Sequence, residues 1–267
     1  HISNTAKQIL IYKALNFKLP IFSHTPLILN SEGKKLSKRD CVTSIDEFKE
    51  MGYLPEALAN YMAFLGWSIK DPKTEILSLS EISKVFNLSD VNKGGAKFNW
   101  EKLNWINSQY IKKMELVKLN GFIKKYWVEK GWESPSKEWE IKLTALIKDS
   151  MILLKDAIDQ SKPFFSLSQI KEEGKEFLEN NKDAKQSLKY ILSYLKEENI
   201  SKIDAANAKE IINKISVKNS IKKGIVMKSL RVAFFGCLSG PDLTQSWELF
   251  SESKSDISRI ERCIKSI

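Results

Sequence analysis

Apolar side chains recur every three or four residues through the second half of the chain, from about residue 115 onward. That spacing places them on one side of an α-helix, so the pattern predicts several helices that each bury one face. The runs of glycine, proline and β-branched residues that would indicate a barrel or sandwich are absent there, and we expect an all-helical assembly with short loops. The recurring positions are Leu116, Leu119, Ile123, Trp127, Leu143, Ile147, Leu154, Ile158, Leu188, Ile191, Leu195, Ala208, Ile211 and Ile215.

The first forty residues have a mixed pattern. Residues 4–16 carry apolar positions at helical spacing, and Pro20 is expected to end that helix. Two apolar runs of strand length follow at residues 21–22 and 26–29, before the turn residues 30–33. The sequence therefore predicts a strand that leads directly into a loop, which is where α/β folds place ligand-binding residues.

Capping residues mark the predicted ends of several helices. Ser44 and Glu47 have the spacing of a capping box, Gly52 suits a left-handed position after a helix, and Pro55 suits the first turn of the next one. Further N-terminal caps are expected at Ser78, Asn99, Asp204 and Asp242.

Aromatic and methionine residues between 55 and 110 are expected in the core. Leu58, Tyr61, Met62 and Leu65 fall at i, i+3, i+4 and i+7, which predicts one buried stripe rather than a cofactor-binding surface. Trp100 and Trp105 could stack on nucleic acid bases, although burial is the commoner use of tryptophan.

Charge changes this picture because it is unevenly placed. The chain has 43 Lys and Arg against 33 Asp and Glu, a net charge of +10. Residues 1–39 hold seven basic side chains and one acid, and residues 211–241 hold six basic side chains and no acid. Clustered cations favour a polyanionic partner, since they neutralise phosphates and release counterions. No run of 18 apolar residues occurs, so no membrane partner is expected.

The potential metal ligands and nucleophiles are scattered. The three cysteines form no Cys-x-x-Cys or Cys/His group, which fits a reducing cytosol and argues against a zinc site, so no metal-ligating residue is predicted. His1 and His24 are expected to make local hydrogen bonds. Neither Gly-rich nucleotide-binding fingerprint is present, so any phosphate would be met by flexible lysines.

The segment Gly33–Asp40 places three lysines and an arginine within six residues, beside a glycine and a serine. Composition alone allows two interpretations, a solvated turn and a phosphate-handling loop, and favours the turn. A second basic stretch, Lys222–Gly236, is expected to be a helix, followed by a turn at Gly240–Pro241. Arg231 lies there between apolar neighbours with no acid near it in sequence, so its partner must come from elsewhere.

The ordered set of motifs resembles a known family. Lys35-Leu36-Ser37-Lys38-Arg39 is similar to the Lys-Met-Ser-Lys-Ser loop of class I aminoacyl-tRNA synthetases. Its context resembles bacterial-type glutamyl-tRNA synthetases, through the segments 1–5, 26–29, 52–57, 65–67, 98–111, 230–233 and 240–242. Glutaminyl-tRNA synthetases fit less well, because their anticodon region is built of β-barrels.

The resemblance implies a nucleotide site. Lys38 would meet the phosphates of ATP, which is expected with Mg²⁺, and Lys35 would support it. Leu36, Ile28 and His1 match positions near the adenosine.

It also implies a site for the tRNA anticodon. The matching positions are Arg231, Pro241, Leu243, Ser150 and Lys228. An arginine that reads a base by two hydrogen bonds is a common form of such a contact.

The fold class implied is mainly α: the end of a Rossmann-type catalytic domain and a stem-contact fold, followed by an all-helical anticodon-binding cage. The expected boundaries are 1–39 for the catalytic end, 40–114 for the stem-contact domain, and 115–175 and 176–267 for two anticodon-binding subdomains.

The sequence departs from the family pattern in three respects. The other ATP signature, His-Ile-Gly-His, and the glutamate pocket are not found in it, so we expect a C-terminal portion that is inactive alone. Cys41 stands where glycine is common. Ser150 stands where members restricted to tRNA-Glu carry arginine, which leaves tRNA-Gln open as a second substrate.

The expected function is therefore that of a glutamate–tRNA ligase fragment acting with ATP, L-glutamate and tRNA-Glu, as a cytoplasmic monomer. The alternative is a non-catalytic tRNA-binding module derived from a synthetase.

Overall fold

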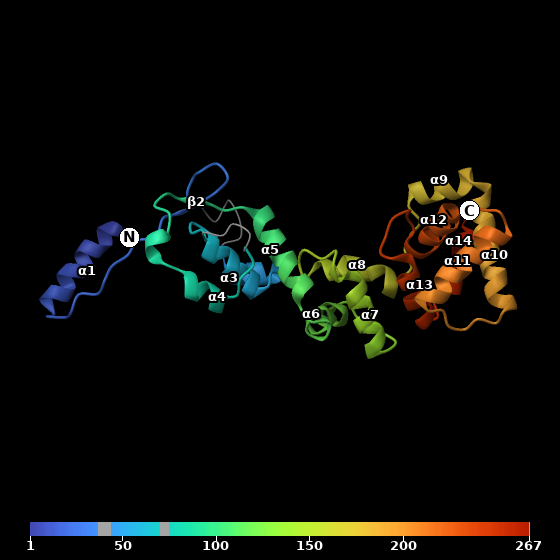
Figure 1. Cartoon of the computed structure of the whole chain (residues 1–267), viewed down its shortest axis with the longest axis horizontal. Coiled ribbons are helices and arrows are strands. Elements are labelled where there is room, and N and C mark those ends of the chain that lie inside the picture. The colour runs from blue at the N-terminus through green and yellow to red at the C-terminus, as the bar shows by residue number, and fades with distance from the viewer. Residues whose placement is uncertain (37–43, 70–74, 267) are drawn as a thin grey trace. The chain divides into compact units, whose positions relative to one another are not determined.

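The computed structural model describes residues 1–36, 44–69 and 75–266, and it divides into two compact units, His1–Tyr110 and Ile111–Ile267. Fourteen α-helices and one two-stranded sheet are present in the described residues (Figure 1). This confirms the predicted mainly α fold. None of the described helices has the length and apolar content needed to cross a membrane.

The first unit combines short helices with the small sheet. Its elements are α1 (Ile2–Ala14), β1 (Ile28–Leu29), α2 (Ile45–Met51), α3 (Pro55–Phe64), α4 (Leu79–Val85), the 3₁₀ turn η1 (Leu88–Asp90), β2 (Ala96–Lys97) and most of α5 (Trp100–Lys113).

The sheet joins segments nearly seventy residues apart. Strands β1 and β2 run parallel, with Ile28 opposite Ala96 and Leu29 opposite Lys97. A Cβ added at Gly95 would lie 2.6 Å from Leu29 Cδ1 and 3.1 Å from the Leu27 carbonyl oxygen, so a side chain there would displace Leu29 where the two segments meet.

The predicted capping residues are confirmed. Ser44 and Glu47 form a reciprocal capping box, Gly52 adopts a left-handed conformation with φ of 97°, and Pro55 begins α3. Asn99, Asp204 and Asp242 each accept a hydrogen bond from a backbone N–H in the first turn of their helices, and Ser78 forms a second capping box with Glu81.

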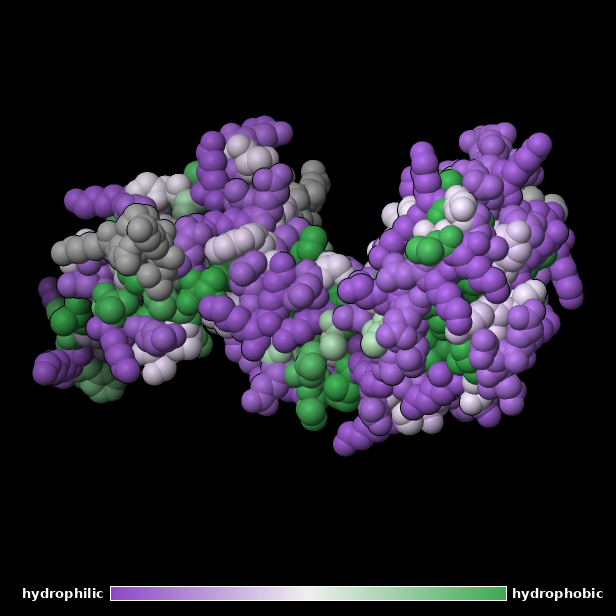
Figure 2. All heavy atoms as spheres, turned by 45° about the vertical axis from the view of Figure 1, so that its right-hand side comes forward, coloured by the Kyte–Doolittle hydropathy of each residue, from purple (hydrophilic) through white to green (hydrophobic). Residues whose placement is uncertain are grey.

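Of two expectations for the N-terminal region, the helix is confirmed with shifted ends and one strand is wrong. Helix α1 runs from Ile2 to Ala14 rather than over residues 4–16, and it buries no residue. The run at 21–22 forms no strand, since a strand needs a partner and β2 pairs only with Ile28 and Leu29; Ile21 is 99% exposed. Figure 2 shows other apolar residues exposed on the surface as well.

The stripe expected in α3 is also partly wrong. Tyr61 is buried, but Met62 is 41% exposed, and the buried positions are instead Ala57, Asn60 and Tyr61. Asn60 is fully buried because its amide accepts from Leu77 N–H and donates to the Glu75 carbonyl oxygen. A tertiary hydrogen-bond pair therefore sets which side of this helix faces inward.

An aromatic cluster stabilises the first unit. Trp100 packs against Phe48, Tyr53 and Phe98, with ring centroids 4.9 to 6.4 Å apart. Trp100 is thus a packing residue, whereas Trp105 remains 45% exposed.

The second unit is wholly helical in its described part. Its elements after α5 are α6 (Leu116–Glu129), α7 (Lys137–Lys148), α8 (Asp156–Phe165), α9 (Glu172–Asn180), α10 (Lys182–Glu197), α11 (Ala205–Lys218), α12 (Lys223–Phe235), α13 (Leu243–Glu252) and α14 (Asp256–Lys265). Helices α6, α7 and α8 pack together, and α12 packs against α10, α11 and α14. Most of the predicted apolar positions are buried here, as expected.

Helix α13 joins these two groups of helices by packing on α7. The indole N–H of Trp139 donates to the Leu249 carbonyl oxygen at 2.9 Å. Lys142 on α7 donates to Glu248 at 2.6 Å and to Glu252 at 2.8 Å. These hydrogen bonds raise the pKa of Lys142, so the lysine is fully protonated at neutral pH.

Candidate nucleic-acid interface

A tight turn follows β1 and carries the start of the lysine-rich segment. The Asn30 side-chain oxygen accepts from the Glu32 and Lys34 N–H groups, and Gly33 takes a φ of 80°. Leu36 N–H donates to the Ile28 carbonyl oxygen at 3.0 Å. The turn is therefore a defined hairpin, as expected for a strand that leads into a loop.

The structure brings together some of the candidate nucleotide-site residues. Ile28 and Leu36 are hydrogen-bonded neighbours and half-buried, and the adjacent Lys35 is exposed, with no ion pair to any described residue. His1 is exposed and lies within hydrogen-bonding distance of Asn4. Lys38 lies outside the described residues, as do Ser37, Arg39 and Cys41.

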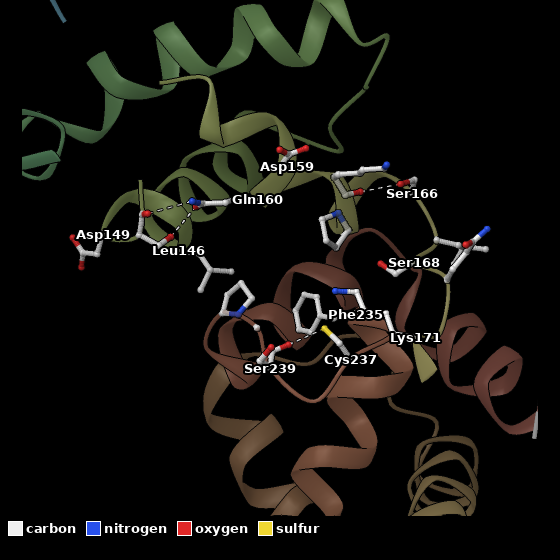
Figure 3. Close-up of a pocket in the computed structure, with 17 residues that line it drawn as sticks. Leu146, Asp149, Asp159, Gln160, Ser166, Ser168, Lys171, Phe235, Cys237 and Ser239 are labelled. Carbon is white, nitrogen blue, oxygen red and sulfur yellow. Dashed lines mark hydrogen bonds between the residues drawn. The ribbon is translucent and has the colours of Figure 1, made fainter. Parts of the chain in front are cut away.

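A cavity of about 1200 Å³ opens in the second unit (Figure 3). Three segments distant in sequence line it: the end of α7 with α8, the connection between α8 and α9, and the loop after α12. Two of the candidate anticodon residues, Ser150 and Pro241, lie in its wall. No arginine side chain is among its described lining residues.

The wall formed by α7 and α8 is neutral to acidic. Asp149, Ser150, Asp159 and Gln160 line it, and Ser150 and Gln160 are directly bonded. The Ser150 hydroxyl donates to Gln160 Oε1 at 2.7 Å, and Gln160 Nε2 donates to the Ser150 carbonyl oxygen at 3.3 Å (Figure 3).

The loop after α12 forms the second wall, and Arg231 holds it. Its Nη1 donates to the Gly240 carbonyl oxygen at 3.0 Å and to the Pro241 carbonyl oxygen at 2.9 Å. The partner that the sequence required from elsewhere is thus the backbone of this loop. The Cys237 thiol donates to the Ser239 carbonyl oxygen, which tightens the same turn.

Asp242 ends this loop and caps α13. Partial burial opposes the ionisation of Asp242 and raises its pKa. Its carboxylate accepts hydrogen bonds from the Gln245 and Thr244 N–H groups and from the Thr244 hydroxyl. Together with the nearby Arg231 cation, these bonds lower the pKa of Asp242 below the ordinary value. Asp242 is therefore a carboxylate at neutral pH, and it anchors the loop to the helix that follows.

The third wall consists of residues 163–171, and two arginine side chains of α14 hold it by hydrogen bonds. Arg259 donates to the carbonyl oxygens of Pro163 and Ser166, and Arg262 donates to that of Ser168. At the end of this segment, Lys171 N–H donates to the Gly236 carbonyl oxygen at 2.8 Å.

Gly236 allows the closest approach between this segment and α12. It ends α12 with a φ of 73°, and a Cβ there would lie 2.0 Å from the Gln169 carbonyl oxygen. Only glycine fits, for reasons of both conformation and space.

The other candidate anticodon residues are placed differently. Leu243 is 1% exposed and does not line the cavity, so the structure places it in the core at the start of α13. Lys228 is exposed on α12, with its Nζ 5.9 Å from the centre of the Phe177 ring. Sequence reasoning missed Gln160 and the segment 163–171, because neither carries a motif. In the described residues no cluster of three or more His, Cys, Asp or Glu could hold a metal ion.

Comparison with known proteins fits this architecture. The family model described as "tRNA synthetases class I (E and Q), catalytic domain" matches residues 1–105, and the model described as "Anticodon binding domain" matches residues 104–264. The second match covers the whole helical region around the cavity.

Relatives of known name match nearly the whole chain. The chain is 84% identical over 263 residues to a glutamate–tRNA ligase of Prochlorococcus marinus subsp. pastoris, covering 98% of this chain and 55% of the relative. It is 51% identical to the glutamate–tRNA ligase of Prochlorococcus marinus strain NATL2A, over 99% of this chain and 55% of that relative. A crystal structure of a glutamate tRNA ligase from Elizabethkingia meningosepticum superposes with a TM-score of 0.85 at 31% identity. The superposition covers 99% of this chain and 55% of that one.

The two family models and the helical second unit define the class, which is the class I tRNA synthetases with an anticodon-binding domain. Within that class the chain belongs to the glutamyl-tRNA synthetase family. It spans about half the length of the curated relatives it matches.

Proposed function

We propose that the chain is the part of a glutamate–tRNA ligase that supplies the lysine-rich loop and binds the tRNA. The reaction joins glutamate to the α-phosphate of ATP with release of pyrophosphate, and then transfers the glutamyl group to the 3′ end of tRNA-Glu. The observation that supports this most is the succession, on one chain, of a catalytic-domain match and an anticodon-binding match.

ATP would lie against the hairpin after β1. The exposed ammonium group of Lys35 is available to phosphate oxygens, and Lys38 follows three residues later in the chain. Such cations stabilise the charge that develops on the departing pyrophosphate. Ile28 and Leu36 would contact the adenosine, together with His1. Mg²⁺ is expected with ATP, and its ligands would come mainly from the phosphates, since the described residues form no carboxylate or histidine cluster.

The tRNA anticodon would enter the cavity of the second unit. Ser150 and Pro241 face it from two walls, and Arg231 supports the loop that carries Pro241. Lys228 would add a phosphate contact, and the buried Leu243 would support the start of α13 beside Pro241. Because Ser150 is neutral, we propose that tRNA-Gln is accepted as well as tRNA-Glu.

The remaining features of the proposal are a cytoplasmic location, a monomer, and domain boundaries at 1–39, 40–114, 115–175 and 176–267. The basic charge of the chain and the absence of a membrane-spanning helix among its described helices are consistent with a soluble partner of tRNA.

Lys38→Ala tests the catalytic part of the proposal. In the full-length protein, glutamate-dependent exchange of pyrophosphate into ATP should fall at least tenfold, because a cation on the phosphates is lost, whereas tRNA affinity should be retained. An unchanged exchange rate would remove Lys38 from the mechanism.

The alternative function is a tRNA-binding module without catalysis, for which the cavity of the second unit would suffice. Tight tRNA binding by a full-length protein that shows no glutamate-dependent exchange would favour the module. Exchange that depends on glutamate would exclude it.

A further inference from the structure

We infer that Lys97 binds a phosphate group of a substrate together with Lys35, from the same face of the small sheet. This inference rests on the proposed function, in which the ammonium group of Lys35 is available to phosphate oxygens. Lys97 lies on β2, far from the hairpin in sequence and outside the segments that carry the family resemblance.

Both lysines are paired with the same residue of β1. Lys35 lies opposite Leu29 in an antiparallel bridge, and Lys97 lies opposite Leu29 in the parallel register of β1 and β2. Residues paired directly across neighbouring strands point to the same face of a sheet, so the three side chains form one row. Adjacent strands are about 4.8 Å apart, which places the two lysine Cα atoms roughly 10 Å from each other. Two flexible four-carbon stems can close that gap on one anion.

The side chain of Lys97 lies toward the hairpin. A Cβ added at Gly33 would lie 4.0 Å from Lys97 Cε, so the end of this side chain is beside the turn that carries Lys35. Both lysines are exposed, and neither forms an ion pair with a described residue, whereas Lys34 pairs with Glu32. Two cations on one face repel each other, and an anion bound between them offsets that repulsion.

The surface between the two lysines suits a phosphate ester. The Leu29 side chain extends over Gly95, where an added Cβ would lie 2.6 Å from Leu29 Cδ1. The row therefore has an apolar centre for a ribose and a cation at each end for phosphate oxygens. The side chains of Ile28 and Leu36 alternate with this row and face the other way. The lysine face is thus open to a phosphate of the tRNA as well as to those of ATP.

A purely structural explanation exists for lysines at these positions. Lys35 and Lys97 lie on the two outer segments of the described sheet, and an exposed lysine on an edge strand discourages pairing with another chain. That role needs a charge of either sign and has no effect on the affinity for a substrate. Reversing the sign of the charge therefore separates the two explanations.

The test measures the Michaelis constants of the full-length protein for ATP and for tRNA-Glu in aminoacylation. Lys97→Gln should raise one of them about fivefold, because a charge-assisted contact with phosphate is lost. Lys97→Glu should raise the same constant further through repulsion, and Lys97→Arg should stay within about twofold of wild type because it keeps the cation. A rise in the constant for ATP assigns the phosphate to ATP, and a rise in the constant for tRNA-Glu assigns it to the tRNA.

The double variant that combines Lys35→Gln with Lys97→Gln tests whether the two lysines hold one phosphate. Its fold-change should be smaller than the product of the two single changes, because residues that share a contact are not additive. A fold-change equal to that product would overturn the shared contact.

Lys84→Gln and Lys84→Glu are matched controls, because Lys84 is exposed on α4 of the same unit and the charge changes are identical. They should leave both constants unchanged. Equal constants for wild type, Lys97→Gln and Lys97→Glu, in a protein that still charges tRNA, would overturn the role of Lys97 and leave the proposed function intact. A wild-type protein that charges no tRNA with glutamate would overturn both.

Discussion

Arg259 offers the clearest test of how the second unit is held together. Its side chain is 4% exposed, and its guanidinium makes no ion pair with any described residue. Nη1 donates to the Phe234 carbonyl oxygen at 3.0 Å, and Nη2 donates to those of Pro163 at 2.7 Å and Ser166 at 3.0 Å. The guanidinium also lies 4.3 Å from the centre of the Phe250 ring.

Two of these carbonyls belong to the last turns of α8 and α12, where helix carbonyls lack partners within the helix. The negative ends of two helices therefore take the place of a carboxylate. Burial lowers the pKa of Arg259 to about 10, which still leaves it protonated at neutral pH.

We expect Arg259→Met to destabilise the second unit by about 4 kcal/mol. The substitution keeps a long apolar stem but leaves three carbonyl oxygens without their charged donor, and each buried acceptor left unpaired costs about 1–3 kcal/mol. For a unit of this length, that corresponds to a fall of about 8–16 °C in the unfolding midpoint.

Calorimetry of the whole chain would measure this change. The transition of the first unit should not move and provides an internal reference. Lys265→Met, an exposed position on the same helix, is the matched control and should cost less than about 1 kcal/mol. A fall of less than about 3 °C for Arg259→Met would refute the view that two helix ends hold this cation.

Three further predictions follow from the same structure. Arg231→Ala should weaken tRNA binding by about 1–3 kcal/mol, because the carbonyl oxygens of Gly240 and Pro241 lose their donor and the loop that carries Pro241 loses its support; an unchanged affinity in a filter-binding assay would refute this supporting role. Lys142→Met should lower the free energy of unfolding in urea by about 2 kcal/mol, because Glu248 and Glu252 lose their common partner in a half-buried site. Lys142→Arg, which keeps the charge, should lower it less. Folding lowers the pKa of Asp242, so its carboxylate stabilises the folded chain above about pH 4, and this stabilisation is lost as the pH falls through the pKa of the folded state. Asp242→Asn still caps the helix. Between pH 5 and pH 3 its free energy of unfolding should therefore fall less than that of wild type.

The sequence predicts best those features that depend on neighbouring residues. Capping at Ser44 and Asp242, the left-handed Gly52 and the helix end at Gly236 are set by hydrogen bonds and dihedral angles within one turn, and all four are confirmed. The helical stripes of the second half are confirmed for a similar reason, because their periodicity extends over several turns.

Features that depend on distant partners could not be predicted in this way. The burial of Asn60 in α3 depends on backbone groups at Glu75 and Leu77, which no periodicity reveals. The candidate site shows the same limit. Motif similarity nominated Ser150 and Pro241, but only the fold places them in one cavity, and Gln160 lies there because α8 packs beside the end of α7.

The walls of the cavity are held by arginines that donate to backbone carbonyl oxygens. Arg231 holds the loop after α12, while Arg259 and Arg262 hold the segment 163–171, and none of the three forms an ion pair with a described residue. The same groups therefore fix the shape of the cavity and add positive potential beside it. A planar guanidinium suits both purposes, because its fork can reach two carbonyls without an ion pair, although the Asp242 carboxylate lies near Arg231. Carboxylate partners would fix the walls equally well, but they would cancel the attraction for a phosphate backbone. The carbonyl partners thus leave unpaired cations behind two of the walls, in contrast to the α7–α8 wall, which carries Asp149 and Asp159.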